Sequence, residues 1–333
     1  MHDPAMEIAI FSTCPASAGL EPAVFRRRVV EVARWSERQR CRGILVYTDN
    51  SLLDPWLVAG LIVESTASLV PLVAVQPAYM HPYTVAKMVT SFGALHGRAV
   101  HLNMVAGGFT NDLRALCDMT PHDRRYDRLR EYTTIIKLLL GGQTVTFKGD
   151  FYQVERLRLA PPLAPELMPL IWISASSPAG LAVARALDAV LVQYPTATDD
   201  TTAGDDHDAA MQAVRVGIVA RADDDEAWRV AHARFPEDRA GQIAHTLAVR
   251  ASDSVWHKEL SRPAPEATPY WLVPFHNYKT FCPYLVGAYE RVAGELVRHL
   301  RHGVNAFILD VPSDEDDLRH ARIAFEHAMV AVG

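Results

Sequence analysis

The chain has 333 residues, 49% of them hydrophobic and 22% charged, which is ordinary for a soluble globular protein. A net charge of -6 and the lack of a basic stripe argue against a nucleic-acid surface. No stretch approaches the roughly 18 apolar residues that a membrane span requires. The four cysteines form no CxxC pair, so we expect no metal site, and without a secretory signal before them we expect a cytoplasmic protein.

Strand and helix patterns alternate through the first half of the chain. Strands are expected at residues 7–12, 43–47, 69–76 and 99–103, and helices at 22–40, 54–66 and 82–95. Asp54 is the expected N-cap of the second helix, with Pro55 at its first position. The strands are continuous apolar runs without alternation, which indicates a parallel sheet covered on its outer face.

The second half continues this alternation. A long helix is expected behind His122, then a hairpin at residues 144–154 and strands at 170–174, 189–193, 214–221 and 305–310. Helices are expected at 178–187, 199–211 and 287–302, with another starting in the acidic run 223–226, and Ser313 is the expected cap of the last one. Eight such units predict a single TIM (β/α)8 barrel over residues 1–333. A doubly wound open sheet is the alternative, but no GxGxxG follows the first strand.

An insertion at residues 235–283, before the last barrel helix, breaks this rhythm. It is rich in aromatic residues, including those in the stretch PFHNYKTF around Lys279. Long loops within a compact domain are typically lids or binding loops. We therefore weigh a lid over the barrel mouth equally with a subunit contact.

The carboxyl ends of the strands supply the candidate site residues, because TIM-barrel active sites lie at that face. Gln76 and Asn103 each end a predicted strand. The run from Ser174 to Gly180 joins a strand to a helix start, where free N–H groups and the helix dipole favour an anion such as phosphate. Within it, Ser176 and Ser177 offer hydroxyls, and Ala179 and Gly180 offer backbone N–H groups, while a plain serine N-cap is the other interpretation.

Several segments, taken in order, resemble the bacterial luciferase-like flavin-dependent monooxygenases, closest to the alkanesulfonate monooxygenase branch. They are LNMVAGG from Leu102, HDRRYDR from His122, FKGDFYQV from Phe147, LAPP from Leu159 and ISASSPAG from Ile173. The resemblance covers residues 41–187 well and the rest more loosely.

The resemblance implies a two-component enzyme. A separate reductase would supply reduced FMN, and the flavin would activate O2 to oxygenate a small organic molecule. It further implies that Asn103 contacts the flavin and that His122 and Tyr126, four residues apart on one helical face, lie near it. We expect Asn103, His122 and Lys279 to serve the reaction, and a homodimer or homotetramer.

Departures from the alkanesulfonate enzymes argue against a sulfonate substrate. Leu52, Gly217 and Val311 fall where those enzymes have Cys, His and Tyr, whereas Arg215 matches their strand-seven arginine. We therefore expect a more apolar and roomier pocket. Three alternatives stay open: an F420-dependent oxidoreductase of the same superfamily, a flavin-binding protein with little catalysis, and an unrelated TIM-barrel hydrolase.

Overall fold

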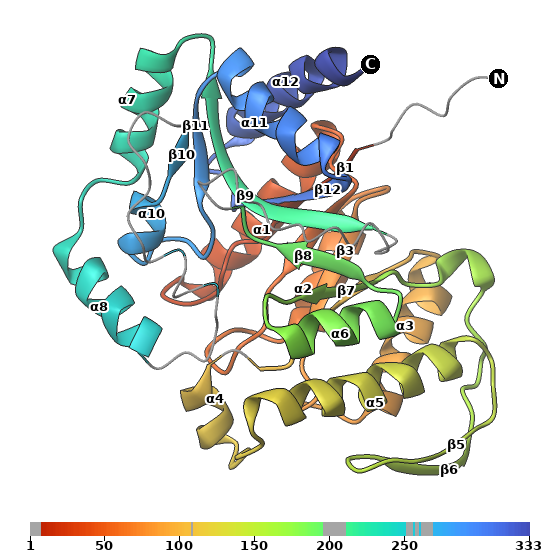
Figure 1. The fold of residues 1–333 in the computed structure, drawn as a ribbon. Coiled ribbons are helices and arrows are strands. Elements are labelled where there is room, and N and C mark those ends of the chain that lie inside the picture. The colour runs from red at the N-terminus through yellow and green to blue at the C-terminus, as the bar shows by residue number, and fades with distance from the viewer. Residues whose placement is uncertain (1–7, 108, 196–210, 251–255, 257–259, 261–268) are drawn as a thin grey trace.

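A closed barrel of eight parallel strands forms the centre of the molecule (Figure 1). The computed structural model describes residues 8–107, 109–195, 211–250, 256, 260 and 269–333. The barrel strands are, in order, β1 (Ala9–Thr13), β2 (Gly43–Val46), β3 (Val70–Val75), β4 (His101–Met104), β7 (Ile171–Ser174), β8 (Val190–Gln193), β9 (Gln212–Arg221) and β12 (Val304–Leu309). Since β12 pairs with β1 and β8 pairs with β9, the ring is complete and the predicted TIM barrel is confirmed.

The helices that surround the barrel begin with clear local signals. They are α1 (Pro22–Arg38), α2 (Pro55–Ser65), α3 (Pro82–His96), α5 (His122–Leu140), α6 (Pro178–Ala186), α7 (Asp224–Arg234), α11 (Tyr289–Arg301) and α12 (Glu315–Val332). Four of them start with proline, directly after a residue whose side chain accepts a first-turn N–H: Glu21, Asp54, His81 and Ser177. Proline fits this position because its missing N–H would have no helical acceptor.

The barrel interior is packed with side chains and is not a pore. Phe11 and Trp172 meet at its centre with ring centroids 4.8 Å apart, and both are fully buried. Apolar residues of the other strands, such as Leu45, Leu72 and Ile308, complete this layer. Any ligand must therefore lie above the layer, at the carboxyl ends of the strands.

Three local features differ from the sequence prediction. Strand β11 (Tyr284–Ala288) occupies the start of the predicted helix at 287–302. It forms because β9 extends beyond the end of its neighbour β8, and β11 pairs with this extension of β9, from Gly217 to Arg221. Asp314, not Ser313, caps α12 and accepts the N–H of Asp317. A short helix α4 (Thr110–Ala115), which the sequence analysis did not predict, precedes α5, and residues 199–210 of a predicted helix lie outside the described residues.

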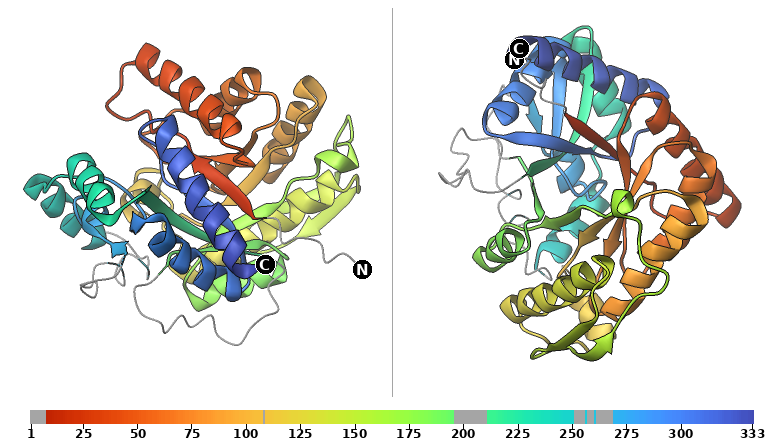
Figure 2. Two further views of the ribbon diagram at one scale, coloured as in Figure 1. Left: turned by 90° about the horizontal axis from the view of Figure 1, so that it is seen from above. Right: turned by 90° about the vertical axis from the view of Figure 1, so that its right-hand side faces the viewer.

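Two additions flank the barrel. The predicted hairpin is formed by β5 (Val145–Lys148) and β6 (Gln153–Leu157), and η1 (Pro165–Leu167) follows it. The described part of the insertion contains α8 (Arg239–Arg250), β10 (Tyr270–Trp271) and α10 (Val273–His276). Figures 1 and 2 show α8 and the hairpin on opposite sides of the barrel. Among the described helices, none is both long and apolar enough to span a bilayer.

Candidate functional site

An arc of polar side chains lies at the carboxyl ends of three adjacent strands, β3, β4 and β7. Gln76 directly follows β3, Asn103 lies on β4, and Ser174 ends β7. The strand register aligns Asn103 with Ala74 on one side and Trp172 on the other. Since Trp172 fills the barrel interior, Asn103 also faces inward, and Ser174 faces the same way two residues nearer the mouth.

Asn103 carries an unsatisfied hydrogen-bonding atom. Its side chain is only 8% exposed, and its Oδ1 has no partner within the described structure. A buried amide oxygen without a partner loses its hydration without compensation, so native proteins seldom leave one. A bound group with an N–H donor would satisfy this atom.

The second part of the arc is the start of α6. Ser177 is 6% exposed and its hydroxyl accepts the N–H of Gly180 at 3.3 Å, so Ser177 is the N-cap. The Gly180 N–H, expected to face a phosphate, is thus directed at Ser177, and the Ala179 N–H is the first-turn donor left without a helical acceptor. Gly180 has another role: a Cβ there would lie 2.6 Å from Ala175 and 2.9 Å from the Tyr126 ring.

Tyr126 reaches this cradle from α5. Burial raises the pKa of Tyr126, and a hydrogen bond with the Ser177 side chain offsets part of that rise. The His122 ring lies 5.3 Å from the Tyr126 ring, edge to face, while His122 Nδ1 lies 2.7 Å from the Asp123 carboxylate. Among the described residues, Tyr126 contacts the Ser177 loop directly, whereas His122 contacts Tyr126.

A cavity of about 250 Å³ opens beside this arc. Leu52, Ala74 and Gln76 line it, together with Tyr79 and Trp56. Leu52 thus lies in the pocket wall, as its match to a functional cysteine of the alkanesulfonate enzymes suggested. The indole Nε1 of Trp56 is buried and has no hydrogen-bond partner among the described residues.

The end of the insertion reaches across the barrel mouth. The Phe281 ring lies 6.4 Å from Tyr47, which follows β2, and 6.3 Å from Phe109, which follows β4. Lys279 belongs to the same turn, but it is half-exposed and its Nζ lies 2.6 Å from the Asp238 carboxylate. The aromatic side chain, rather than the predicted lysine, makes the contact with the barrel.

Arg215 lies opposite the arc, on β9. It is 7% exposed and its guanidinium carbon lies 4.7 Å from the centre of the Tyr47 ring. Its Nη1 is 3.5 Å from the Tyr194 hydroxyl, whereas Nε and Nη2 have no partner among the described residues. The sequence matched Arg215 to the strand-seven arginine of the alkanesulfonate enzymes without nominating it for the site, although it is the lone charged residue within the apolar run AVRVGIVA.

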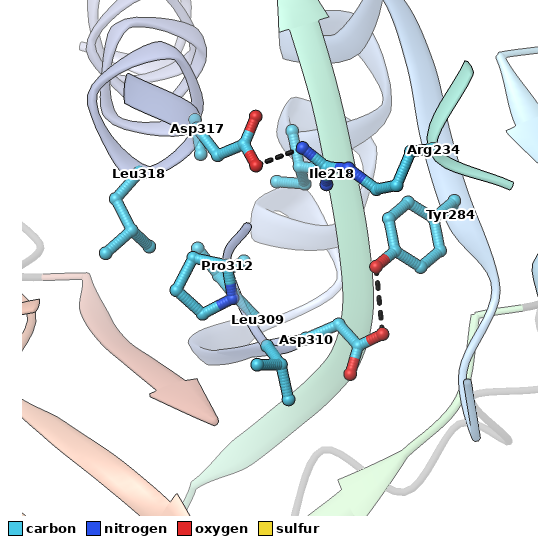
Figure 3. A pocket seen from close by; sticks show the side chains of 10 residues that line it. Ile218, Arg234, Tyr284, Leu309, Asp310, Pro312, Asp317 and Leu318 are labelled. Carbon is cyan, nitrogen blue, oxygen red and sulfur yellow. Dashed lines mark hydrogen bonds and ion pairs between the residues drawn. The ribbon is translucent and has the colours of Figure 1, made fainter. Parts of the chain in front are cut away.

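Tyr284 fills the space expected to be free at Gly217, so the prediction of a roomier pocket is wrong at this position. A Cβ at Gly217 would overlap the Tyr284 ring. The Tyr284 hydroxyl donates to Asp310 at 2.8 Å (Figure 3). Burial and the charge of Asp310 hold the pKa of Tyr284 well above its usual value, so the hydroxyl keeps its proton.

The small cavity drawn in Figure 3 lies beside this pair and has a volume of about 20 Å³, enough for one water molecule. Val311, the third departure, lines this cavity rather than the larger one. Arg234 and the buried Asp317 also line this cavity and form an ion pair, and Arg221 pairs with the same carboxylate. These paired charges hold α7 and α12 to β9, and a structural role accounts for them.

The polar groups of the arc fit a flavin mononucleotide. The α6 start offers a phosphate a helix dipole, the Ala179 N–H and the Ser176 hydroxyl. Asn103 and Gln76 place amide groups one and two strands away, where a ring edge with both donors and acceptors can bind them. The residues present are therefore compatible with the cofactor that the sequence resemblance implies.

Comparisons with known proteins agree with this fold. The sequence model of the luciferase-like monooxygenase family matches residues 6–304. The chain is 34% identical over 309 residues to 4-(gamma-L-glutamylamino)butanoyl-[BtrI acyl-carrier protein] monooxygenase BtrO from Niallia circulans, covering 89% of each chain.

Solved structures share the fold at low sequence identity. The long-chain alkane monooxygenase LadA superposes with a TM-score of 0.76 at 14% identity, over 98% of this chain and 92% of LadA. An F420-dependent secondary alcohol dehydrogenase superposes with a TM-score of 0.66 at 18% identity, over 97% and 99% of the two chains. The family match spans most of the chain, and the chain therefore belongs to the luciferase-like monooxygenases.

Proposed function

We propose that this protein is a two-component monooxygenase that uses reduced FMN and O2 to oxygenate an acyl group delivered on a carrier protein. The observation that carries the flavin part is the arc formed by Gln76, Asn103 and the Ser177 loop with Tyr126. The carrier-bound substrate is inferred from the 34% identical relative, whose name specifies an acyl-carrier-protein substrate.

The phosphate would bind at the start of α6. Its charge is stabilised there by the helix dipole and by the Ala179 N–H. Ser176 adds a hydroxyl, and Tyr126 closes the cradle from the α5 side. No basic side chain is required, since helix N-termini bind phosphate with backbone groups.

The ring system would extend from there along the ends of β4 and β3. Asn103 Oδ1 would accept a hydrogen bond from it, and Gln76 would bind the same polar edge. When bound, reduced FMN supplies the two electrons that the reaction needs: one oxygen atom of O2 enters a C–H bond of the substrate and the other leaves as water.

The protein's main contribution would be to exclude water from the reacting atoms. Phe281 packs against Tyr47 and Phe109, and thereby holds the end of the insertion over the mouth. Closing a site over reactive species limits wasteful hydrolysis and proton leakage. In this proposal the insertion is a lid.

A flavin reductase is the proposed second component, since the sequence contains no nicotinamide-binding fingerprint. One observation favours the F420-dependent alternative: the fold superposes on an F420-dependent alcohol dehydrogenase with a TM-score of 0.66. Titration of the protein with FMN and with F420, followed by tryptophan fluorescence, separates the two. We expect FMN to bind at least about 10-fold more tightly, and tighter binding of F420 contradicts the proposal.

A further inference from the structure

Arg215 is a buried cation on the wall of the barrel mouth opposite the proposed flavin arc. Its strand partner is Ile308, which faces the barrel interior, so Arg215 also points inward. It lies one residue past Val214, the partner of Gln193 at the end of β8. The side chain therefore stands just above the packed interior, where a ligand in the mouth would meet it.

The Arg215 guanidinium is held in place by two aromatic side chains, and one edge of it has no hydrogen-bond partner among the described residues. The Tyr47 ring covers one face at 4.7 Å, and the Tyr194 hydroxyl accepts from Nη1 at 3.5 Å. Nε and Nη2, for which the described residues supply no partner, carry N–H groups that point in the same direction. That pair forms the fork that arginine uses to bind a carboxylate through two parallel hydrogen bonds.

Three other arginines that are largely buried have carboxylate partners. Arg221 and Arg234 share Asp317, and Arg128 pairs with Asp118. Near Arg215 the carboxylate of Asp310 accepts from Tyr284 instead, and no ion pair joins it to Arg215 among the described residues. A buried charge without a partner is costly, so an arrangement that retains one is typical of a site for an anion.

We propose that Arg215 binds a carboxylate on the substrate, at the end of the acyl group remote from its thioester. This inference deepens the proposed function and rests on it for the carrier-bound acyl group, while the anion site rests on Arg215 alone. A thioester is neutral, so a free carboxylate elsewhere on the acyl group is the anion available. The phosphate of a carrier arm is attached at the carrier's surface and would not reach a side chain that is only 7% exposed.

The test compares two small probes by titration calorimetry. The first is 4-(γ-L-glutamylamino)butanamide, in which a neutral amide replaces the thioester and one carboxylate remains. The second is the same compound with that carboxylate converted to a carboxamide. We expect the wild-type protein to bind the first at least about 30-fold more tightly, because the buried fork pairs only with the carboxylate.

The Arg215→Gln and Arg215→Lys variants locate the effect. Arg215→Gln should bind both probes alike, whereas Arg215→Lys, which keeps the charge and loses the fork, should retain a smaller preference for the carboxylate. FMN affinity should change by no more than about twofold in either variant. Equal binding of the two probes by the wild type overturns the proposal. So does a loss of FMN affinity with probe discrimination intact, because the fork would then belong to the cofactor.

Turnover separates this inference from the proposed function. Carrier protein is loaded with the carboxylate or the carboxamide acyl group and supplied with reduced FMN. Equal oxygenation of both leaves the proposed function standing and overturns the carboxylate site. If neither is oxygenated, the proposed function fails, and the calorimetric comparison still decides whether Arg215 binds a carboxylate, since it needs neither carrier nor turnover.

Discussion

Ser177 shows how one side chain can serve both the fold and the proposed cofactor. Its hydroxyl caps α6 by accepting the Gly180 N–H, and the same loop presents the helix start to a phosphate. Aspartate and asparagine are equally good N-caps, so both preserve the helix. They differ in charge, and only aspartate repels a phosphate.

Ser177→Asp is therefore expected to fold normally and to lose FMN. Binding measured by flavin fluorescence should weaken at least about 10-fold for FMN. Riboflavin, which lacks the phosphate, should be affected by no more than about twofold. Ser177→Asn is the neutral control and should bind FMN nearly as the wild type does. An equal loss of both ligands in Ser177→Asp would place the phosphate elsewhere.

Gly217 allows Tyr284 to pack across β9, so Gly217→Ala should destabilise the protein by about 1–3 kcal/mol through overpacking. Gly60→Ala is the matched control, because a Cβ at Gly60 in α2 would meet nothing within 4 Å. That variant should be more stable by about 0.5–1 kcal/mol, since alanine favours the helix. Urea unfolding measures both. An unchanged free energy of unfolding in Gly217→Ala would show that Tyr284 can move aside freely.

At the scale of elements, strand β4 carries a buried histidine that makes stability depend on pH. Burial, and then the charge of Arg42, lower the pKa of His101 from 6.5 to about 4. Between these values the unfolded chain binds a proton that the folded chain does not. The stability contributed by the neutral ring is thus present above pH 6.5 and is lost as the pH falls towards 4.

The expected loss from His101 is at most about 3 kcal/mol between pH 7.5 and 4. His101→Gln should remove this part of the pH dependence when urea unfolding is compared at the two pH values. His302→Gln, at the exposed C-cap of helix α11, serves as the control and should keep this pH dependence. A pH dependence in His101→Gln as steep as in the wild type would mean that other groups cause it.

The turn around Phe281 provides the test of the lid. Phe281→Ala removes the ring that joins the insertion to Tyr47 and Phe109, so we expect more hydrogen peroxide and less product per NADH consumed. Lys279→Ala should have a smaller effect, because the ammonium binds Asp238 and such half-exposed pairs contribute about 0–1 kcal/mol. Asp238→Asn, which removes the same ion pair from the other side, is the control for Lys279→Ala. If only Lys279→Ala uncouples the reaction, Lys279 itself acts in the site, as the sequence suggested.

The sequence predicted the barrel elements well because their signals are local. Apolar runs mark the strands, and a cap followed by proline marks a helix start, as at Asp54 and Ser177. Strand β11 could not be predicted in this way. Its five residues run directly into α11, and what makes them a strand is the unpaired end of β9, a long-range contact. Gly217 was misjudged for the same reason, since the ring that fills its space comes from Tyr284, far along the chain.

At the scale of the whole molecule, the barrel brings together residues from both halves of the chain. Gln76, Asn103 and Ser177 could be proposed from their positions at strand ends, since the fold determines where strand ends meet. The binding role of Arg215 could not, because a sequence does not show which charged side chains pair with one another. The described part of the insertion lies to one side of the barrel (Figure 1), and its end, at Phe281, packs against Tyr47 and Phe109 at the same mouth.

The most direct test of the proposed function is the fate of isotopically labelled O2. The protein is mixed with a flavin reductase, NADH, FMN and carrier protein loaded with the 4-(γ-L-glutamylamino)butanoyl group, and the acyl group is examined by mass spectrometry. Our account predicts one labelled oxygen atom in the acyl group, dependent on FMN. Turnover with reduced F420 and no labelled oxygen in the product would contradict it and favour hydride transfer.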